Sequence, residues 1–299
     1  MMTLVIVGII IMCFVSPVFF CAITHPFKSI YYGIKDLYDY IVHKKWLLCS
    51  VGGIVSYIGL FGLGKTLSVV HDTLMDYQRY NGVKVYDYRR KKWVTQRVRI
   101  ISNVALSIPY EELRSLQQVV EACQTREAYD NEHDTLTVTI ILLDEASSQL
   151  NSRSFRDNIN PLLLGKLLCV RHHYMVMRYT SQRQGMVDAL LRAVTSAVID
   201  CRKLWRYQRN YYYDAWEMEN ANSPLLLRPY KRSCWFVCDC DFEAYDTAAC
   251  VDNLIKSWSE DDMMSEEEIL ALQMNTSTDM DAIVKPSRKW RRAQRKRHG

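Results

Sequence analysis

A glycine-rich motif in the first quarter of the chain constrains its fold more than any other feature of the sequence. Gly59, Gly64, Lys65 and Thr66 match the P-loop pattern G-x-x-x-x-G-K-[ST]. In such a loop, backbone N–H groups surround phosphates, the lysine reaches the β- and γ-phosphates, and the threonine hydroxyl binds Mg²⁺. A short apolar run, residues 53–58, precedes the motif, and apolar residues recur at helical intervals after it. The motif therefore has the strand–loop–helix context it requires, which predicts an α/β P-loop NTPase fold.

A second apolar run, residues 136–143, ends in two acidic residues, Asp144 and Glu145. A buried strand of this kind places a carboxylate at the carboxyl edge of the sheet, where P-loop proteins hold Mg²⁺. We expect Asp144 to support the metal together with Thr66, and Glu145 to polarise the attacking water as general base. ATP is expected to bind the loop residues Gly59, Leu60, Phe61, Gly62, Leu63, Gly64, Lys65, Thr66 and Leu67.

A third strand candidate, residues 174–179, is followed closely by Gln182. A polar side chain at the end of a strand beside the Asp–Glu strand is well placed to sense the γ-phosphate and orient the water. An amide that only caps a helix over residues 186–194 is an equally good interpretation of this spacing. Further strands are expected at residues 83–86, 98–104 and 197–201, the last of these as the final core strand.

Two segments near the carboxyl end of the domain leave alternatives open. Residues 207–216 are rich in aromatic residues with basic residues nearby, which allows stacking on single-stranded bases, but a half-buried strand at the edge of the core fits the alternation better. Four cysteines lack the paired spacing of a zinc site, and we interpret them as buried free thiols: Cys234, Cys238, Cys240 and Cys250.

The chain begins with an uncharged apolar run, residues 4–23, that has the length of a transmembrane helix. No basic segment precedes it, which favours an uncleaved anchor over a signal peptide. Lysines follow the run, and the positive-inside rule then places the rest of the chain in the cytoplasm. Residues 26–41 carry apolar side chains at helical spacing, which predicts an interfacial helix, with a core-facing helix as the alternative.

Several motifs, in the order found here, resemble those of the zonula occludens toxin-like ATPases, the gene I type assembly proteins of filamentous bacteriophages related to the HerA/FtsK branch of P-loop enzymes. The P-loop and the Asp–Glu pair are common to many ATPases. More specific are Arg-His-His at residues 171–173, Thr-Ser-Gln-Arg at 180–183 and Asp-x-x-Leu-Arg at 188–192. The resemblance covers about half of the chain, residues 54–215.

The resemblance implies an additional-strand ATPase core of the RecA/FtsK-like kind, a mostly parallel sheet flanked by helices, with Gln182 as sensor and assembly into a homo-oligomeric ring. In oligomeric motors an arginine of one subunit stabilises charge at the nucleotide of its neighbour. Arg171 and Arg192 are our candidates, while Arg153 and Arg183 also lie in the matched region. A salt bridge is the alternative for each. The span lies before the ATPase region here, whereas in this family it typically follows it.

Together these features predict four segments: a transmembrane anchor at 1–24, a juxtamembrane amphipathic helix at 25–48, the P-loop ATPase domain at 49–258, and a C-terminal helix with a basic tail at 259–299. We expect an ATPase in the host inner membrane whose cytoplasmic domain drives assembly and export of a single-stranded DNA phage, with coat proteins or DNA as partners. A conjugative or chromosome-translocating DNA motor and a nucleotide-switched membrane scaffold for coat proteins remain open. The tail, with eight Lys and Arg residues and no acid over 285–298, suits DNA phosphates or anionic lipids.

Overall fold

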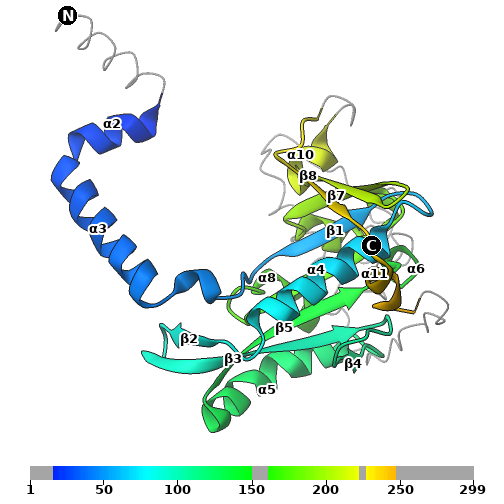
Figure 1. Ribbon diagram of the computed structural model, residues 1–299, viewed down its shortest axis with the longest axis horizontal. Coiled ribbons are helices and arrows are strands. Elements are labelled where there is room, and N and C mark those ends of the chain that lie inside the picture. The colour runs from blue at the N-terminus through cyan, green and yellow to red at the C-terminus, as the bar shows by residue number, and fades with distance from the viewer. Residues whose placement is uncertain (1–15, 150–160, 222–226, 247–299) are drawn as a thin grey trace, which may run out of the picture.

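A computed structural model describes residues 16–149, 161–221 and 227–246 of the 299-residue chain. Within these residues, nine strands form one sheet in the order β2-β3-β5-β6-β1-β7-β8-β9, with β4 beside β3 (Figure 1). The five central strands are parallel: β3 (Lys92–Ser102), β5 (Thr135–Leu143), β6 (Met175–Ser181), β1 (Ile54–Ile58) and β7 (Ala197–Leu204). The two central strands β5 and β6 are buried almost throughout, as expected for strands covered on both faces, whereas β3 and β7 also carry charged residues at exposed or half-buried positions. The predicted mostly parallel α/β sheet is confirmed.

Antiparallel pairs extend both ends of the sheet. At one end β2 (Lys84–Asp87) forms an antiparallel hairpin with β3, and the short strand β4 (Glu111–Glu112) pairs with β3 in parallel. At the other end β8 (Tyr207–Asp214) pairs with β7, and β9 (Lys231–Phe236) pairs with β8. The predicted strand over residues 207–216 is therefore present, but β9 makes it internal rather than an edge strand. For the same reason, β7 is the last of the parallel strands but not the last strand of the sheet.

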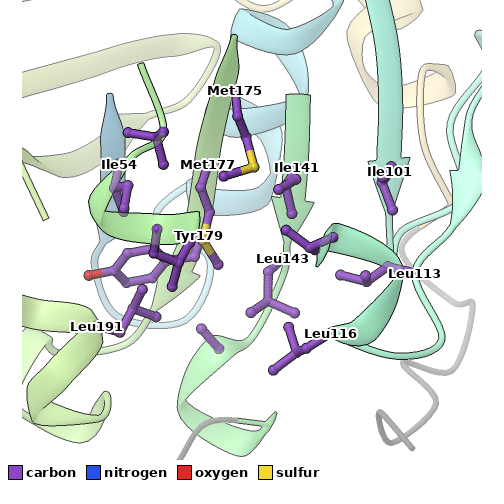
Figure 2. Packing of buried hydrophobic residues seen from close by; sticks show 14 of the residues in the cluster. Ile54, Ile101, Leu113, Leu116, Ile141, Leu143, Met175, Met177, Tyr179 and Leu191 are labelled. Carbon is purple, nitrogen blue, oxygen red and sulfur yellow. The ribbon is translucent and has the colours of Figure 1, made fainter. Parts of the chain in front are cut away.

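Helices cover both faces of the parallel strands. On one face α4 (Lys65–Tyr80) packs over β1, β3 and β6. On the other face a larger apolar cluster joins the sheet to α5 (Gln117–His133), α8 (Pro161–Leu168) and α9 (Ala189–Ala193). Figure 2 shows this cluster, in which Met177 and Tyr179 of β6 lie beside Ile141 and Leu143 of β5. Burial of this apolar surface holds the carboxyl ends of β5 and β6 in a fixed relation.

The helix predicted over residues 186–194 is shorter in the structure. A 3₁₀ turn, η2 (Gln184–Met186), comes first, and α9 begins only after Asp188. The Asp188 carboxylate accepts a 2.8 Å hydrogen bond from the backbone N–H of Leu190, which is a standard N-cap.

Two helices precede the sheet and project away from it in Figure 1: α2 (Pro17–Thr24) and α3 (Pro26–Val42). Among the residues that the structure describes, no helix has both the length and the apolarity needed to cross a membrane. Most of the expected span, residues 4–23, lies outside the described residues. The helix expected over residues 26–41 is present as α3, and its apolar stripe is exposed rather than core-facing: Phe27, Ile30, Ile34, Leu37 and Ile41.

The cysteine prediction was wrong in one respect. Cys234, Cys238 and Cys240 are free thiols, but they are exposed, because β9 lies at the edge of the sheet and α11 (Asp239–Glu243) lies on the surface. The sulfur atoms of Cys238 and Cys240 and a carboxylate oxygen of Asp241 lie within 4.8 Å of one another. That carboxylate already accepts the N–H of Cys238 at 2.8 Å and contacts His71. Cys250 lies outside the described residues, as do Arg153, the expected C-terminal helix and the basic tail.

Candidate nucleotide site

The P-loop connects β1 to α4 at the carboxyl edge of the sheet, as predicted. Gly62 and Gly64 adopt φ angles of 74° and 80°, a left-handed conformation that side chains disfavour. Lys65 begins α4 and is a buried residue, and its ammonium donates a 3.2 Å hydrogen bond to the carbonyl oxygen of Leu60. The first turn of a helix leaves backbone N–H groups without intrahelical partners, and these attract anions. The loop thus offers one cation and several backbone donors to a phosphate.

The strand order brings the predicted chemical residues to this same edge. β6 lies between β1 and β5 and is parallel to both. The carboxyl ends of these three strands therefore meet, and they lead into the P-loop, Gln182 and Asp144 respectively. A strand inserted between the P-loop strand and the acidic strand is the arrangement that the resemblance implied.

Thr66 and Asp144, the two residues predicted to support Mg²⁺, are in direct contact. The Thr66 hydroxyl donates to the Asp144 carboxylate, with distances of 3.0 Å to Oδ1 and 3.2 Å to Oδ2. These residues are 78 positions apart in the sequence, so the contact depends on the sheet order. A hydroxyl and a carboxylate are oxygen ligands of the kind that Mg²⁺ prefers.

Two residues that the sequence analysis did not identify hold Asp144 in place. Thr180, near the end of β6, is fully buried and donates a 2.6 Å hydrogen bond to Asp144 Oδ1. Asn103, directly after β3, accepts the backbone N–H of Asp144 at 2.7 Å and donates to its carbonyl oxygen at 3.0 Å. Both residues follow or end neighbouring parallel strands, which was the available signal for finding them.

Glu145, the predicted general base, occupies a constrained position. Its φ angle is 52°, which is unusual for a residue with a side chain, and its backbone N–H donates a 2.9 Å hydrogen bond to the Thr180 hydroxyl. Strained backbone of this kind persists only where the surroundings fix it, and it clusters at functional sites. Thr180 therefore positions both acidic residues at once.

Gln182 follows β6 directly and is half-buried. Asp188 caps α9 and Arg183 precedes η2, so the interpretation of Gln182 as a helix cap does not hold. The nearby Gln184 has a structural role, because its amide bonds to the hydroxyls of Ser56 at 2.7 Å and Tyr179 at 3.3 Å. The role of Gln182 as γ-phosphate sensor stays a prediction.

The two candidate arginines lie away from the P-loop of their own chain. Arg171 is exposed and packs against Gly52, which precedes β1, so it lies at the opposite edge of the sheet. Arg192 forms an ion pair with Glu219 of α10 (Ala215–Asn220) and donates to the carbonyl oxygen of Val187 at 3.2 Å. Action on a neighbouring subunit stays a prediction for both.

Gln208 is a further residue that the sequence analysis missed. It is fully buried on β8, and its amide donates to the P-loop carbonyl of Leu63 at 3.1 Å and to the Asn210 side chain at 3.2 Å. Asn210 in turn accepts a 3.2 Å hydrogen bond from Ser68 of α4. The Oε1 atom of Gln208 is buried with no hydrogen-bond partner among the described residues. β8 therefore supports the P-loop from the side, through a contact between residues 145 positions apart.

No protein-family model matches the chain, and no curated protein matches it. Among solved structures, the chain is similar to the N-terminal domain of zonular occludens toxin from Neisseria meningitidis, at 18% identity and a TM-score of 0.43 over 66% of this chain and 100% of that one.

Two further structures are similar to this chain. One is the genome packaging NTPase B204 of Sulfolobus turreted icosahedral virus 2, in complex with ATP-gammaS, at 14% identity and a TM-score of 0.34, covering 62% of this chain and 93% of that one. The other contains ATPases 2 and 3 of EssC from Geobacillus thermodenitrificans, at 12% identity and a TM-score of 0.36, covering 75% of this chain and 43% of that one.

Proposed function

We propose that this chain is a P-loop ATPase that binds ATP with Mg²⁺ and hydrolyses it. The observation that carries the proposal is the contact between Thr66 and Asp144 at 3.0 Å, where Thr66 directly follows the buried Lys65 of the P-loop. A hydroxyl and a carboxylate in contact next to a phosphate-binding loop are the donor set that a magnesium–nucleotide complex needs.

The residues divide the chemistry among them as follows. Lys65 and the backbone N–H groups of the loop and of the first turn of α4 bind the phosphates. Thr66 and Asp144 would hold Mg²⁺, which neutralises charge on the phosphates when bound. Glu145 takes a proton from the attacking water, and Gln182 orients that water. Thr180 fixes Asp144 and Glu145 relative to each other, so that metal support and proton transfer occur in a set geometry.

We also propose that ATP hydrolysis drives assembly and export of a filamentous-type, single-stranded DNA phage at the host inner membrane, by a homo-oligomeric ring. The family resemblance of the motifs supports this use of the energy. The exposed apolar stripe of α3 supports membrane association, because a helix with one apolar and one charged face lies well at a membrane surface. A conjugative or chromosome-translocating motor would use the same site for another DNA substrate.

Steady-state phosphate release by the full chain, with ATP and Mg²⁺, tests the enzymatic proposal. We expect turnover that disappears when Mg²⁺ is chelated and when Lys65 is replaced by alanine. ATP binding without turnover in the wild-type chain would favour the scaffold that uses nucleotide only as a switch.

Membrane association is tested separately by carbonate extraction of cells that express the full chain. We expect the protein in the membrane pellet, and protease added from the cytoplasmic side should digest the ATPase domain. Recovery of the intact chain in the soluble fraction would reject the anchor without affecting the ATPase proposal.

A further inference from the structure

The antiparallel extension of the sheet, β7–β8–β9, has two chemically different faces. On β8, Gln208 and Asn210 point toward α4 and the P-loop and are buried, while Tyr207 and Arg209 alternate with them and are exposed. Side chains alternate between the faces of a strand, so Tyr207, Arg209 and Tyr211 share the face away from α4. We call this side the outer face.

The strand register defines the composition of the outer face, because residues that pair across antiparallel strands point to the same side. One row contains Leu204, Tyr207 and Phe236, the next contains Arg202, Arg209 and Cys234, and the third contains Asp200, Tyr211 and Arg232. The helix α10 covers only the far end of β7 and β8, where Ala215 packs on the buried Val198. The three rows near the hairpin turn lie beyond that helix.

An aromatic cluster forms the tip of the outer face. Trp205, in the β7–β8 turn, has its ring 5.9 Å from each of the rings of Tyr207 and Phe236, which are 5.6 Å from each other. These residues are 70%, 48% and 48% exposed. Trp205 has a φ of 55°, which a bulky residue rarely adopts. Exposed aromatic residues that touch each other form an apolar patch, and such patches commonly mark binding sites.

Arginines lie next to this cluster. Arg202 has its guanidinium 5.1 Å from the ring of Tyr211 and pairs with Asp200 at 2.9 Å. Arg209 and Arg232 are exposed and form no ion pair with any residue that the structure describes, and Arg232 lies 5.9 Å from the Tyr211 ring. The outer face therefore combines uncompensated positive charge with flat aromatic surfaces.

We propose that the outer face binds single-stranded nucleic acid, with its arginines on phosphates and its rings stacked on bases. Single strands offer both a regular negative charge and exposed π faces, whereas duplex DNA hides its base faces. A second copy of the chain is a poor occupant in a symmetric contact, because that would bring arginines together. The identity of the polymer rests on the proposed motor function, but binding itself does not require hydrolysis.

The strand β8 connects the proposed binding surface to the nucleotide site. One face of the strand holds the P-loop through Gln208, and the other face presents Tyr207 and Arg209. A ligand that moves β8 would therefore change the hydrogen bond from Gln208 to the carbonyl oxygen of Leu63 in the P-loop. We therefore expect single-stranded DNA to change the ATPase rate, and this change to require the outer face.

The test is binding of a fluorescent oligothymidine to the full chain over a salt series, with two substitutions that separate the roles. We expect Trp205→Ala to weaken binding by about 5-fold or more at every salt concentration, because stacking is lost without loss of charge. We expect Arg209→Ala to flatten the slope of log affinity against log salt by about 0.7, the value for one phosphate contact on a single strand. The control variants are Trp93→Ala on β3 and Arg114→Ala in the segment between β4 and α5. They should change neither quantity, since both residues are exposed and lie away from the outer face.

ATPase activity without DNA should be unchanged in Trp205→Ala and Arg209→Ala, which makes failure of this proposal distinguishable from failure of the ATPase proposal. Wild-type binding by both variants would overturn the inference. A change of oligomeric state in Trp205→Ala with wild-type DNA affinity would also overturn it, and would identify the outer face as a subunit contact. Weaker binding of duplex DNA than of the oligothymidine is expected, and the reverse order would contradict the stacking role.

Discussion

The side chain of Gln208 lies so close to Gly64 that a Cβ at position 64 would stand 2.2 Å from Gln208 Oε1. No real Cβ contact is that short, and Gln208 is fully buried and tied to Leu63 by a hydrogen bond. Gly64 is therefore required both by its left-handed φ of 80° and by the neighbouring strand β8. The nearby Gly62 has a similar φ of 74°, but nothing within 4 Å of its virtual Cβ.

This pair of glycines gives a matched comparison. Gly62→Ala should destabilise the protein by about 1–2 kcal/mol, the penalty of placing an L-residue in the left-handed region. Gly64→Ala should lower the free energy of unfolding by roughly 1–3 kcal/mol more than Gly62→Ala does, because its methyl group overlaps a buried side chain. Urea unfolding measures both values. Equal losses for the two variants would contradict the steric role of Gln208.

The same contact predicts coupling between the two positions. In the double variant Gly64→Ala with Gln208→Ala, the overlap is removed, so the loss of stability should be smaller than the sum of the two single losses. A double-mutant cycle by urea unfolding measures this difference. Strict additivity would indicate that the loop moves away from Gln208 without strain.

Lys65→Ala and Glu145→Gln should fail at different steps of the ATPase cycle. Lys65 contributes positive charge to phosphate binding, so its removal should weaken ATP binding at least about 10-fold. Glu145→Gln keeps the size of the side chain but cannot accept a proton, so it should bind ATP and turn it over at least about 100-fold more slowly. Equilibrium binding of a fluorescent ATP analogue and steady-state phosphate release separate these outcomes. Wild-type turnover by Glu145→Gln would show that another group is the base.

Thr180 should act as a positioning residue for both acids. Thr180→Val keeps the shape of the side chain but removes the donor to Asp144 and the acceptor of the Glu145 N–H. The Glu145 N–H is then left without its hydrogen bond, which costs about 1–3 kcal/mol of stability. We expect kcat to fall at least about 10-fold and the Mg²⁺ concentration for half-maximal rate to rise. Thr180→Ser keeps the hydroxyl, so its kcat and its Mg²⁺ dependence should be close to those of the wild type. If Thr180→Val lowers stability alone and leaves the Mg²⁺ dependence unchanged, the positioning role is refuted.

The local parts of the nucleotide site were predictable from the sequence because each depends on neighbouring residues. The P-loop between β1 and α4 has its glycines, lysine and threonine within eight positions. The strand β5 consists only of apolar residues and threonines, and the acids at 144 and 145 follow it directly. Local pattern and chain context agree in these segments.

The supporting residues could not be assigned without the order of the strands, because they come from strands that are distant in the sequence. Asn103, Thr180 and Gln208 are common polar residues in ordinary strand contexts, and only the sheet order brings them to the Asp144 region or the P-loop. The cysteines of residues 234–240 were assigned to the interior because free cysteine is usually buried, whereas their position at a sheet edge exposes them. The positions of these residues depend on pairing between strands distant in the sequence, which hydrophobic periodicity does not reveal.

Arg178 on β6 shows how the central strand is tied to the P-loop helix. Its guanidinium donates to Thr73 at 3.0 Å and forms an ion pair with Asp76, both on α4. The Arg178 side chain is 11% exposed and that of Asp76 is 28% exposed, so this pair is largely desolvated. A neutral replacement for Arg178 would leave Asp76 without its partner against the sheet.

We therefore expect Arg178→Met to lower the free energy of unfolding by about 3 kcal/mol, near the lower end of the range for a broken buried pair, because Asp76 keeps partial access to water. The control is Arg114→Met, which breaks the pair with Glu112 where the two side chains are 70% and 52% exposed, and which should change stability by less than about 1 kcal/mol. Urea unfolding at low and high salt measures both variants. The difference in free energy of unfolding between the wild type and Arg178→Met should persist at high salt, since screening acts weakly on a desolvated pair. A loss below about 1 kcal/mol, or one that disappears at high salt, would show that Arg178 is not what holds α4 against β6.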